Sequence, residues 1–297
     1  MLGEPAERRH AVCVSSEEIS AATSPHWVWD PSLYAGSARF YAAGRVAYPV
    51  ELAEALARAL KLDGSGRLLD VGCGPGSLSL LLARHFAEVI GIDADADMLV
   101  EAALLAEERN VRNVSWRHLR AEELPAELPL VRVATFAQSF HWMDRRRVAD
   151  AVRGMLAPGG ALVHVHATTH QGIDSEAQLA YPQPPRAEIT RLVQRYLGQN
   201  RRAGQGVLTA GTADGEEVIY RAAGFIGPER LEVPGWVVDR TAEQIAASVY
   251  SLSSAAPHLF GERLPQFDTE LRQLLANAAS DGRFSEQMRC IALDVWR

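Results

Sequence analysis

Residues Arg67 to Leu78 read RLLDVGCGPGSL, and this stretch predicts the fold. Its first part, RLLDV, is largely apolar and is typical of a buried parallel strand. Three glycines follow at alternate positions, Gly72, Gly74 and Gly76, and leucines at helical spacing come directly after them. A strand, a glycine-rich turn and a helix form the nucleotide-binding corner of a doubly wound α/β sheet.

The residues around the glycines indicate which nucleotide this corner holds. A dinucleotide-binding turn reads G-x-G-x-x-G, but Ser77 stands where the third glycine belongs, and the chain has no G-x-x-x-x-G-K-[ST] phosphate loop. The pattern is instead D-x-G-x-G-x-G, and Asp70 places negative charge beside the position of a pyrophosphate. This acid favours a ligand whose near end is cationic. S-adenosylmethionine carries an ammonium group and a sulfonium and has no phosphate.

A second acid supports the same interpretation. The apolar segment EVIGI, residues 88–92, ends at Asp93, which lies 21 residues after Gly72. An acid about 20 residues beyond the first glycine, at the tip of the second strand, accepts the hydroxyls of a ribose. The alternative is an ordinary βαβ turn with an incidental acid, but two features at the right spacing favour a nucleoside site.

With these motifs, residues 34–165 resemble the class I S-adenosylmethionine-dependent methyltransferases, and in particular the subgroup related to trans-aconitate methyltransferases. LLDVGCGPGSL is similar to the first motif of the family, VIGIDAD to its second-strand acid, and LAPGGALVHV to its turn and fifth strand. AQSFHWMD, residues 137–144, and YAAGRVAYP, residues 41–49, resemble segments of the subgroup. The resemblance implies an α/β, doubly wound, Rossmann-like, mostly parallel seven-stranded sheet with an antiparallel C-terminal strand.

The alternation of strands and helices predicts how the chain is organised. Predicted strands cover residues 68–71, 88–92, 114–118, 131–137, 161–166, 229–233 and 290–296, the last inserted antiparallel at the sheet edge. We expect an N-terminal arm and cap helices in 1–48, the cofactor-binding core in 49–166, an inserted lid in 167–216, and the rest of the core with further lid elements in 217–297. The aromatic-rich segment 25–48 either closes over the cofactor or packs without touching it.

The resemblance also assigns residues to the cofactor. The predicted cofactor-binding residues are Tyr41, Arg45, Asp70, Gly72, Cys73, Gly74, Asp93, Ala94, Met98, Ala121, Glu122 and Gln138. The resemblance implies that Asp70 orients the methionine end and that Asp93 accepts both ribose hydroxyls. Arg120 departs from the family pattern, which usually has an acid there, because arginine cannot accept a hydrogen bond from the adenine amino group. Either Glu122 or the backbone alone takes over that contact.

Methyl transfer is an in-line displacement that proximity can drive, and it needs a base only when the acceptor carries a proton. His141 is the candidate base, with a structural histidine as the alternative. Trp142, His166 and His170 are the candidate substrate-binding residues. His164 lies two residues before His166 on the same predicted strand face. However, no acid or cysteine completes a known ligand spacing with these histidines, so we expect no metal.

Composition limits the remaining function classes. The 297 residues carry a net charge of −7 and no basic run, which disfavours a nucleic-acid partner. The N-terminal stretch MLGEPAERRH has no apolar core of a signal peptide, and no 18-residue apolar run predicts a membrane span, so we expect a cytoplasmic protein. Lys61 is the sole lysine, which suggests a high-GC genome and makes a specialised natural-product pathway plausible. The oligomeric state is not predicted.

These observations lead to one main hypothesis and three alternatives. The main hypothesis is methyl transfer from S-adenosylmethionine to an oxygen or nitrogen of a small-molecule metabolite. The first alternative is carboxylate O-methylation of a small acid, which predicts a cationic pocket. The second is a catalytically inactive cofactor-binding regulatory or partner protein. The third, a nicotinamide oxidoreductase, is weakened by Asp70 and Ser77.

Overall fold

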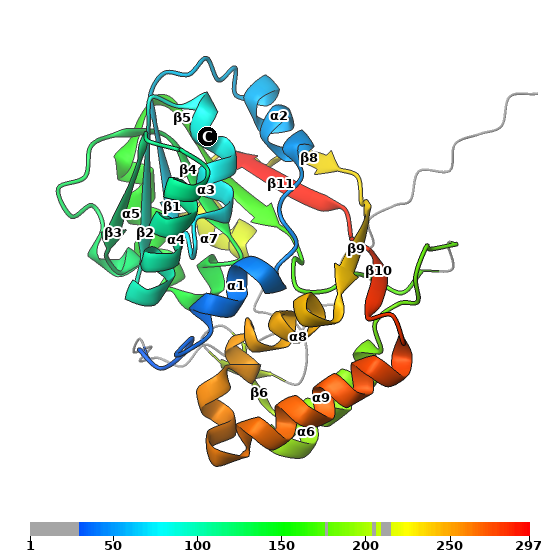
Figure 1. Cartoon of the computed structure of the whole chain (residues 1–297). Helices are drawn as coiled ribbons and strands as arrows, with labels where there is room; N and C mark the ends of the chain where they lie inside the picture. The colour runs from blue at the N-terminus through cyan, green and yellow to red at the C-terminus, as the bar shows by residue number, and fades with distance from the viewer. Residues whose placement is uncertain (1–29, 176–177, 204–205, 209–214) are drawn as a thin grey trace, which may run out of the picture.

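The computed structural model describes residues 30–175, 178–203, 206–208 and 215–297, and it contains a seven-stranded sheet of order β3-β2-β1-β4-β5-β11-β8 (Figure 1). The strands are β1 (Arg67–Val71), β2 (Glu88–Asp93), β3 (Val114–His118), β4 (Val131–Ala137), β5 (Leu156–His166), β8 (Glu229–Val233) and β11 (Ile291–Trp296). The first five strands pair in parallel, and β11 is antiparallel to both of its neighbours. The predicted α/β class and mostly parallel sheet are therefore confirmed.

Two details of the predicted sheet are wrong. The C-terminal strand β11 lies between β5 and β8 and not at the edge. Its sequence IALDVW is buried at nearly every position and needs a strand on each side, whereas ERLEV of β8 is mostly exposed and suits an edge. In addition, β5 begins at Leu156 rather than at residue 161, because the PGG turn is accommodated in the strand by a register shift against β4.

Helices cover both faces of the sheet. They are α1 (Ala38–Gly44), α2 (Val50–Ala59), α3 (Ser77–Leu82), α4 (Ala96–Glu108), α5 (Arg145–Met155), α6 (Arg186–Leu197), α7 (Glu216–Ala222), α8 (Ala242–Tyr250) and α9 (Leu264–Ala278). The leucines of α2 and α3 pack on one face, and α5 and α7 pack on the other around Tyr220 and Trp296. Within the described part of the chain, none of these helices has the length and apolar character required to span a bilayer.

A third apolar cluster forms a helical unit below the sheet in Figure 1. Here α6, from the segment predicted as a lid, packs against α9 and α8, which come from the last part of the chain. A short antiparallel pair, β9 (Val237–Thr241) with β10 (Arg283–Gln287), joins this unit to the sheet, and β6 (Arg201–Ala203) pairs with β7 (Gly206–Leu208). The predicted domain boundaries stay a prediction, and 1–29 of the arm and 176–177, 204–205 and 209–214 of the lid lie outside the described residues.

An ion-pair cluster links α6 of the helical unit to the β9–β10 pair and to the end of α1. Glu286 of β10 accepts hydrogen bonds from Arg186 at 3.0 and 2.9 Å and from Arg240 at 2.9 Å. Arg240 also donates to the carbonyl of Gly44 at 2.7 Å, which ties the end of α1 to the same point. Glu286 is 3% exposed and Arg240 is 5% exposed, whereas the Arg186 side chain is 20% exposed, so water reaches the cluster only at Arg186. Its three charged groups are stable there because each is hydrogen-bonded to the others or to backbone.

Candidate functional site

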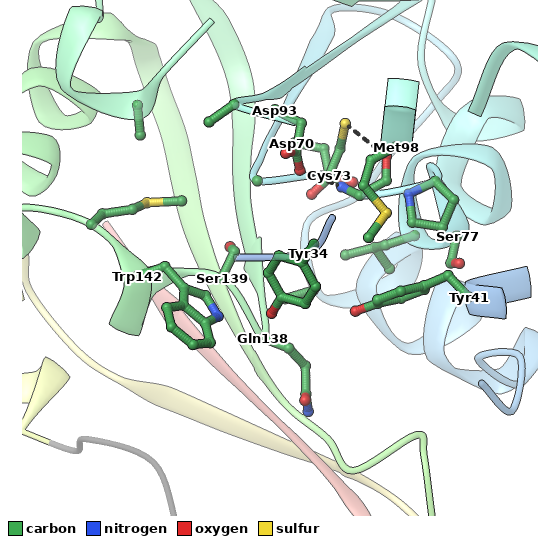
Figure 2. A pocket seen from close by; sticks show the side chains of 18 of the residues that line it. Tyr34, Tyr41, Asp70, Cys73, Ser77, Asp93, Met98, Gln138, Ser139 and Trp142 are labelled. Carbon is green, nitrogen blue, oxygen red and sulfur yellow. Dashed lines mark hydrogen bonds between the residues drawn. The ribbon is translucent and has the colours of Figure 1, made fainter. Parts of the chain in front are cut away.

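A cavity of about 1010 Å³, partly open to solvent, lies at the carboxyl ends of β1, β2 and β4 (Figure 2). Ligands bind at this edge in open α/β sheets. All predicted cofactor-binding residues except Arg45 line it, namely Tyr41, Asp70, Gly72, Cys73, Gly74, Asp93, Ala94, Met98, Ala121, Glu122 and Gln138. The structure thus brings together residues as far apart in the sequence as Tyr41 and Gln138.

The glycine turn is shaped by close packing as much as by its backbone angles. The N–H groups of Gly72 and Cys73 both donate to the carbonyl of Ile92, at 2.9 and 3.0 Å, which holds the turn against β2. A Cβ atom on Gly72 would lie 2.5 Å from the Cβ of Ser139, and one on Gly76 would lie 2.5 Å from the ring of Trp116. Both glycines also have positive φ, so a side chain at either position would be strained and would overlap a neighbour.

We expect Gly72→Ala to destabilise the fold by about 2 kcal/mol or more, since positive φ and steric overlap both disfavour alanine there. Gly74→Ala is the matched control, because Gly74 also has positive φ but no atom lies within 4 Å of its added Cβ. Urea denaturation of the two variants should show that Gly72→Ala lowers the free energy of unfolding more than Gly74→Ala does. Equal losses would mean that backbone angle alone, and not packing against Ser139, selects glycine at this position.

Asp70 is at the floor of the pocket and is 1% exposed. Its two carboxylate oxygens accept hydrogen bonds from Ser79 Oγ at 2.6 Å and Thr135 Oγ1 at 2.8 Å. Burial raises the pKa of Asp70 above its usual range, although these two hydrogen bonds oppose the rise. The side chain therefore joins β1 to α3 and β4, and a direct contact with a ligand stays a prediction.

Asp93 at the end of β2 is oriented by two backbone groups. Its Oδ2 accepts from the N–H of Gly74 at 2.7 Å, and its Oδ1 accepts from the N–H of Asp95 at 2.9 Å. A carboxylate oxygen has room for further donors, so each can also accept a ligand hydroxyl. Burial raises the pKa of Asp93 to about 6, with the two backbone hydrogen bonds opposing the rise.

Aromatic rings from the N-terminal segment and from the residues after β4 form another wall. Tyr34, Tyr41, Tyr48 and Trp142 all line the cavity, and the rings of Tyr34 and Trp142 meet edge to face with centroids 5.9 Å apart. Figure 2 shows Asp70 and Asp93 in the upper part of the view and the rings of Tyr34, Tyr41 and Trp142 below them. Burial raises the pKa of Tyr34 and Tyr48, so both phenols stay protonated at neutral pH.

Some lining residues were not among the predicted set. They are Tyr34, Val46, Tyr48, Pro75, Ser77, Leu78, Leu119, Ala137, Ser139 and Met143. The two tyrosines belong to the aromatic-rich segment, and Ser139 and Met143 belong to AQSFHWMD, so the sequence held a signal for these four. The sequence of each segment did not indicate which of its side chains point toward the cavity.

Four predicted site residues do not line the cavity. Arg45 stacks on the ring of Tyr41 at 4.5 Å and donates to the carbonyl of Ser251 at 2.9 Å, so it contacts a lining residue without lining the cavity itself. His141 lies in a 3₁₀ turn, Phe140–Trp142, with its ring 5.0 Å from that of Trp142. His166 contacts Asp294 of β11 at 3.0 Å. The His170 carbonyl accepts hydrogen bonds from Arg186 and Arg240. The ligand contacts predicted for these four residues stay predictions.

The charges around the cavity are of one sign. Among the described residues that line it, Asp70, Asp93 and Glu122 are acidic and none is a lysine, arginine or histidine. Glu122 is partly compensated by Arg120 at 3.6 Å and by the N–H of Asp144 at 2.9 Å. A pocket with this lining attracts a cation and repels phosphate groups.

Comparison with known proteins covers the segment that supplies most of the residues lining this pocket. Residues 68–160 match a family described as a methyltransferase domain. The ubiquinone biosynthesis O-methyltransferase of Psychrobacter arcticus is 37% identical over 107 residues, which is 33% of this chain and 39% of that protein. The one from Leptothrix cholodnii is 39% identical over 102 residues, covering 34% of this chain and 43% of that protein. The chain therefore spans about two fifths of the length of these relatives. The YcgJ protein from Bacillus subtilis has a structure with a TM-score of 0.48 at 17% identity, covering 83% of this chain and 98% of that one.

Proposed function

We propose that this chain, whose residues 68–160 match a methyltransferase-domain family, is a class I S-adenosylmethionine-dependent methyltransferase that transfers a methyl group to an oxygen or nitrogen of a small-molecule metabolite. Oxygen is the favoured acceptor atom, because the matched relatives are named as O-methyltransferases. Members of this family use S-adenosylmethionine, which supplies an electrophilic methyl group on its sulfonium when it is bound.

The observation that carries this proposal is the acidic lining around the glycine turn. The sulfonium and ammonium of S-adenosylmethionine suit a cavity whose charged described residues are Asp70, Asp93 and Glu122. The aromatic rings of Tyr34, Tyr41 and Trp142 add faces that attract a sulfonium cation. A nicotinamide dinucleotide would bring two phosphate charges to the same place, which makes it a poor match.

In this proposal the residues of the chain act mainly by positioning. Asp93 holds the ribose through the lone pairs that Gly74 and Asp95 leave open. The tyrosines and Trp142 exclude water from the reacting atoms and hold an acceptor in line with the methyl group. When the acceptor carries a proton, we propose His141, next to Trp142, as the base that removes it.

Two experiments test the proposal. Calorimetry should show binding of S-adenosylmethionine and none of NAD, and the reverse result would overturn the cofactor assignment. Methyl-labelled cofactor should then label at least one member of an acceptor panel of catechols, hydroxy acids, carboxylic acids and amines, extended to natural-product phenols and sugars. Cofactor binding without label on any acceptor would support an inactive regulatory protein instead.

The panel also tests carboxylate methylation. That alternative predicts a cationic pocket, but the described lining residues offer a carboxylate no positive partner. We therefore expect phenols or alcohols to accept the label before carboxylic acids do. Preferential labelling of an acid would show that groups outside this lining recognise the acceptor.

Cofactor affinity should depend on pH through Asp93. With a pKa of about 6 in the ligand-free protein, the carboxylate is ionised above pH 6 and protonated below it. Only the ionised form offers both oxygens to ribose hydroxyls, so binding lowers this pKa and releases a proton at acidic pH. The dissociation constant should therefore be flat above pH 6 and rise up to about tenfold per pH unit below it.

Calorimetry from pH 5 to 8 measures this profile, and Asp93→Asn is the control because its amide does not titrate in that range. The variant should bind weakly with a flatter profile. An unchanged slope in Asp93→Asn would assign the pH dependence to another group.

A further inference from the structure

Two histidines and a glutamate gather on the side of the sheet that α7 covers. His164 and His166 share one face of β5, and Glu216 begins α7, 50 residues after His166. One ligand atom from each of the three residues lies within 4.8 Å of the other two. His164 Nε2 and Glu216 Oε1 are 3.8 Å apart. We propose that these three residues bind a divalent transition-metal ion of the Zn²⁺ class.

The donor types and the positions of the rings fit such an ion. Zn²⁺ takes imidazole nitrogen and carboxylate oxygen, and three protein ligands with an open fourth position are a common arrangement. Tetrahedral ligands about 2.0–2.2 Å from the metal lie about 3.4 Å from one another. The Glu216 side chain is partly exposed and sits in the first turn of a short helix, so a small rotation can close the remaining gap.

Outer hydrogen bonds hold both rings in position. The Tyr220 hydroxyl contacts His164 Nδ1 at 2.8 Å, which leaves Nε2 toward Glu216. Asp294 contacts His166 Nε2 at 3.0 Å, which leaves Nδ1 as the other ring nitrogen, and Arg230 holds this aspartate through two bonds of 2.7 Å. Metal-binding histidines usually have their second nitrogen held in this way by a carboxylate or another polar group.

The cluster is next to the proposed methyl-transfer pocket but separate from it. His164 is paired with Phe136 and Val165 with Ala137 across β5 and β4, and Ala137 lines the cavity while His164, His166 and Glu216 do not. The ion would thus be one strand from the pocket. Binding of the ion is independent of methyl transfer, so S-adenosylmethionine affinity should be the same with and without the ion.

The test is titration of the metal-stripped full chain with Zn²⁺ by calorimetry, and with Co²⁺ followed by visible absorption. The wild type should bind one ion at this site with an intense tetrahedral Co²⁺ spectrum. Glu216→Gln and His166→Gln should each weaken binding at least tenfold and change the spectrum. His258→Gln, which alters an exposed histidine near α1, is the matched control and should bind as the wild type does.

Circular dichroism will show whether a ligand variant fails to fold. In that case a variant of Asp294, which holds the ligand His166 by a hydrogen bond, still tests the site. Asp294→Asn leaves all three ligands in place and should still weaken Zn²⁺ binding by about 10- to 100-fold. The proposed site would be wrong if the wild type bound Zn²⁺ no more tightly than Glu216→Gln does. It would also be wrong if His258→Gln lost as much Zn²⁺ affinity as the ligand variants. In that case the cluster is an ordinary polar network between β5, β11 and α7, and the S-adenosylmethionine titration stands independently.

Discussion

Glu286→Ala should lower the free energy of unfolding by about 3–5 kcal/mol, the largest stability loss that we expect from a single side chain. Glu286 is the only carboxylate that both Arg186 and Arg240 contact among the ion pairs of the described residues. Burial already lowers the pKa of both guanidinium groups, which shows how strongly this environment disfavours unpaired charge. Removal of the carboxylate leaves the buried Arg240 and the partly buried Arg186 without the counterion that they share, and urea denaturation measures the loss of stability.

Glu229→Ala is the matched control for this prediction. Glu229 also pairs with an arginine at 2.9 Å, Arg297, but both side chains are about half exposed. Surface pairs contribute about 0–1 kcal/mol, so this variant should unfold almost as the wild type does. Glu286→Gln keeps two of the polar contacts but not the charge, so its free energy of unfolding should lie between those of the other two variants. Similar losses for Glu286→Ala and Glu229→Ala would show that water reaches the cluster and screens it.

Asp93→Ala should reduce S-adenosylmethionine affinity by about 3 kcal/mol, or more than a hundredfold. The variant removes the acceptor of two ribose hydroxyls, and hydrogen bonds to a charged group contribute about 1.5–3 kcal/mol each. It also leaves the N–H groups of Gly74 and Asp95 without their acceptor, which loosens the glycine turn. Calorimetry at pH 7.5, where the wild-type carboxylate is ionised, gives the comparison.

Asp97→Ala is the control for charge, because Asp97 is a nearby exposed acid that does not line the cavity. The affinity of the Asp97→Ala variant for S-adenosylmethionine should change by less than about threefold. If Asp93→Ala binds the cofactor as tightly as Asp97→Ala does, Asp93 has no ribose role, and the nucleoside site must be placed elsewhere.

Much of the sheet could be predicted because its strands are marked by local patterns. The predicted ranges 114–118, 131–137 and 229–233 coincide with β3, β4 and β8. VRVATFA of β4 is a largely apolar, β-branched run, and VSWRH and ERLEV alternate polar with less polar residues, so each pattern marks a strand without knowledge of its partners. The glycine turn and Asp93 were also predictable. Their spacing is imposed by the geometry of one βαβ unit, which is contiguous in the sequence.

What the sequence determined by itself was therefore the nucleotide-binding corner, because strand, turn, helix and acid follow one another along the chain. Only the tertiary structure decided that β11 lies inside the sheet, that Glu286 joins Arg186 and Arg240, and that Glu216 completes a cluster with His164 and His166. Each of these depends on partners about 50 or more residues apart. A local pattern of residues specifies which face of an element is buried, but it carries no information on which distant element covers that face.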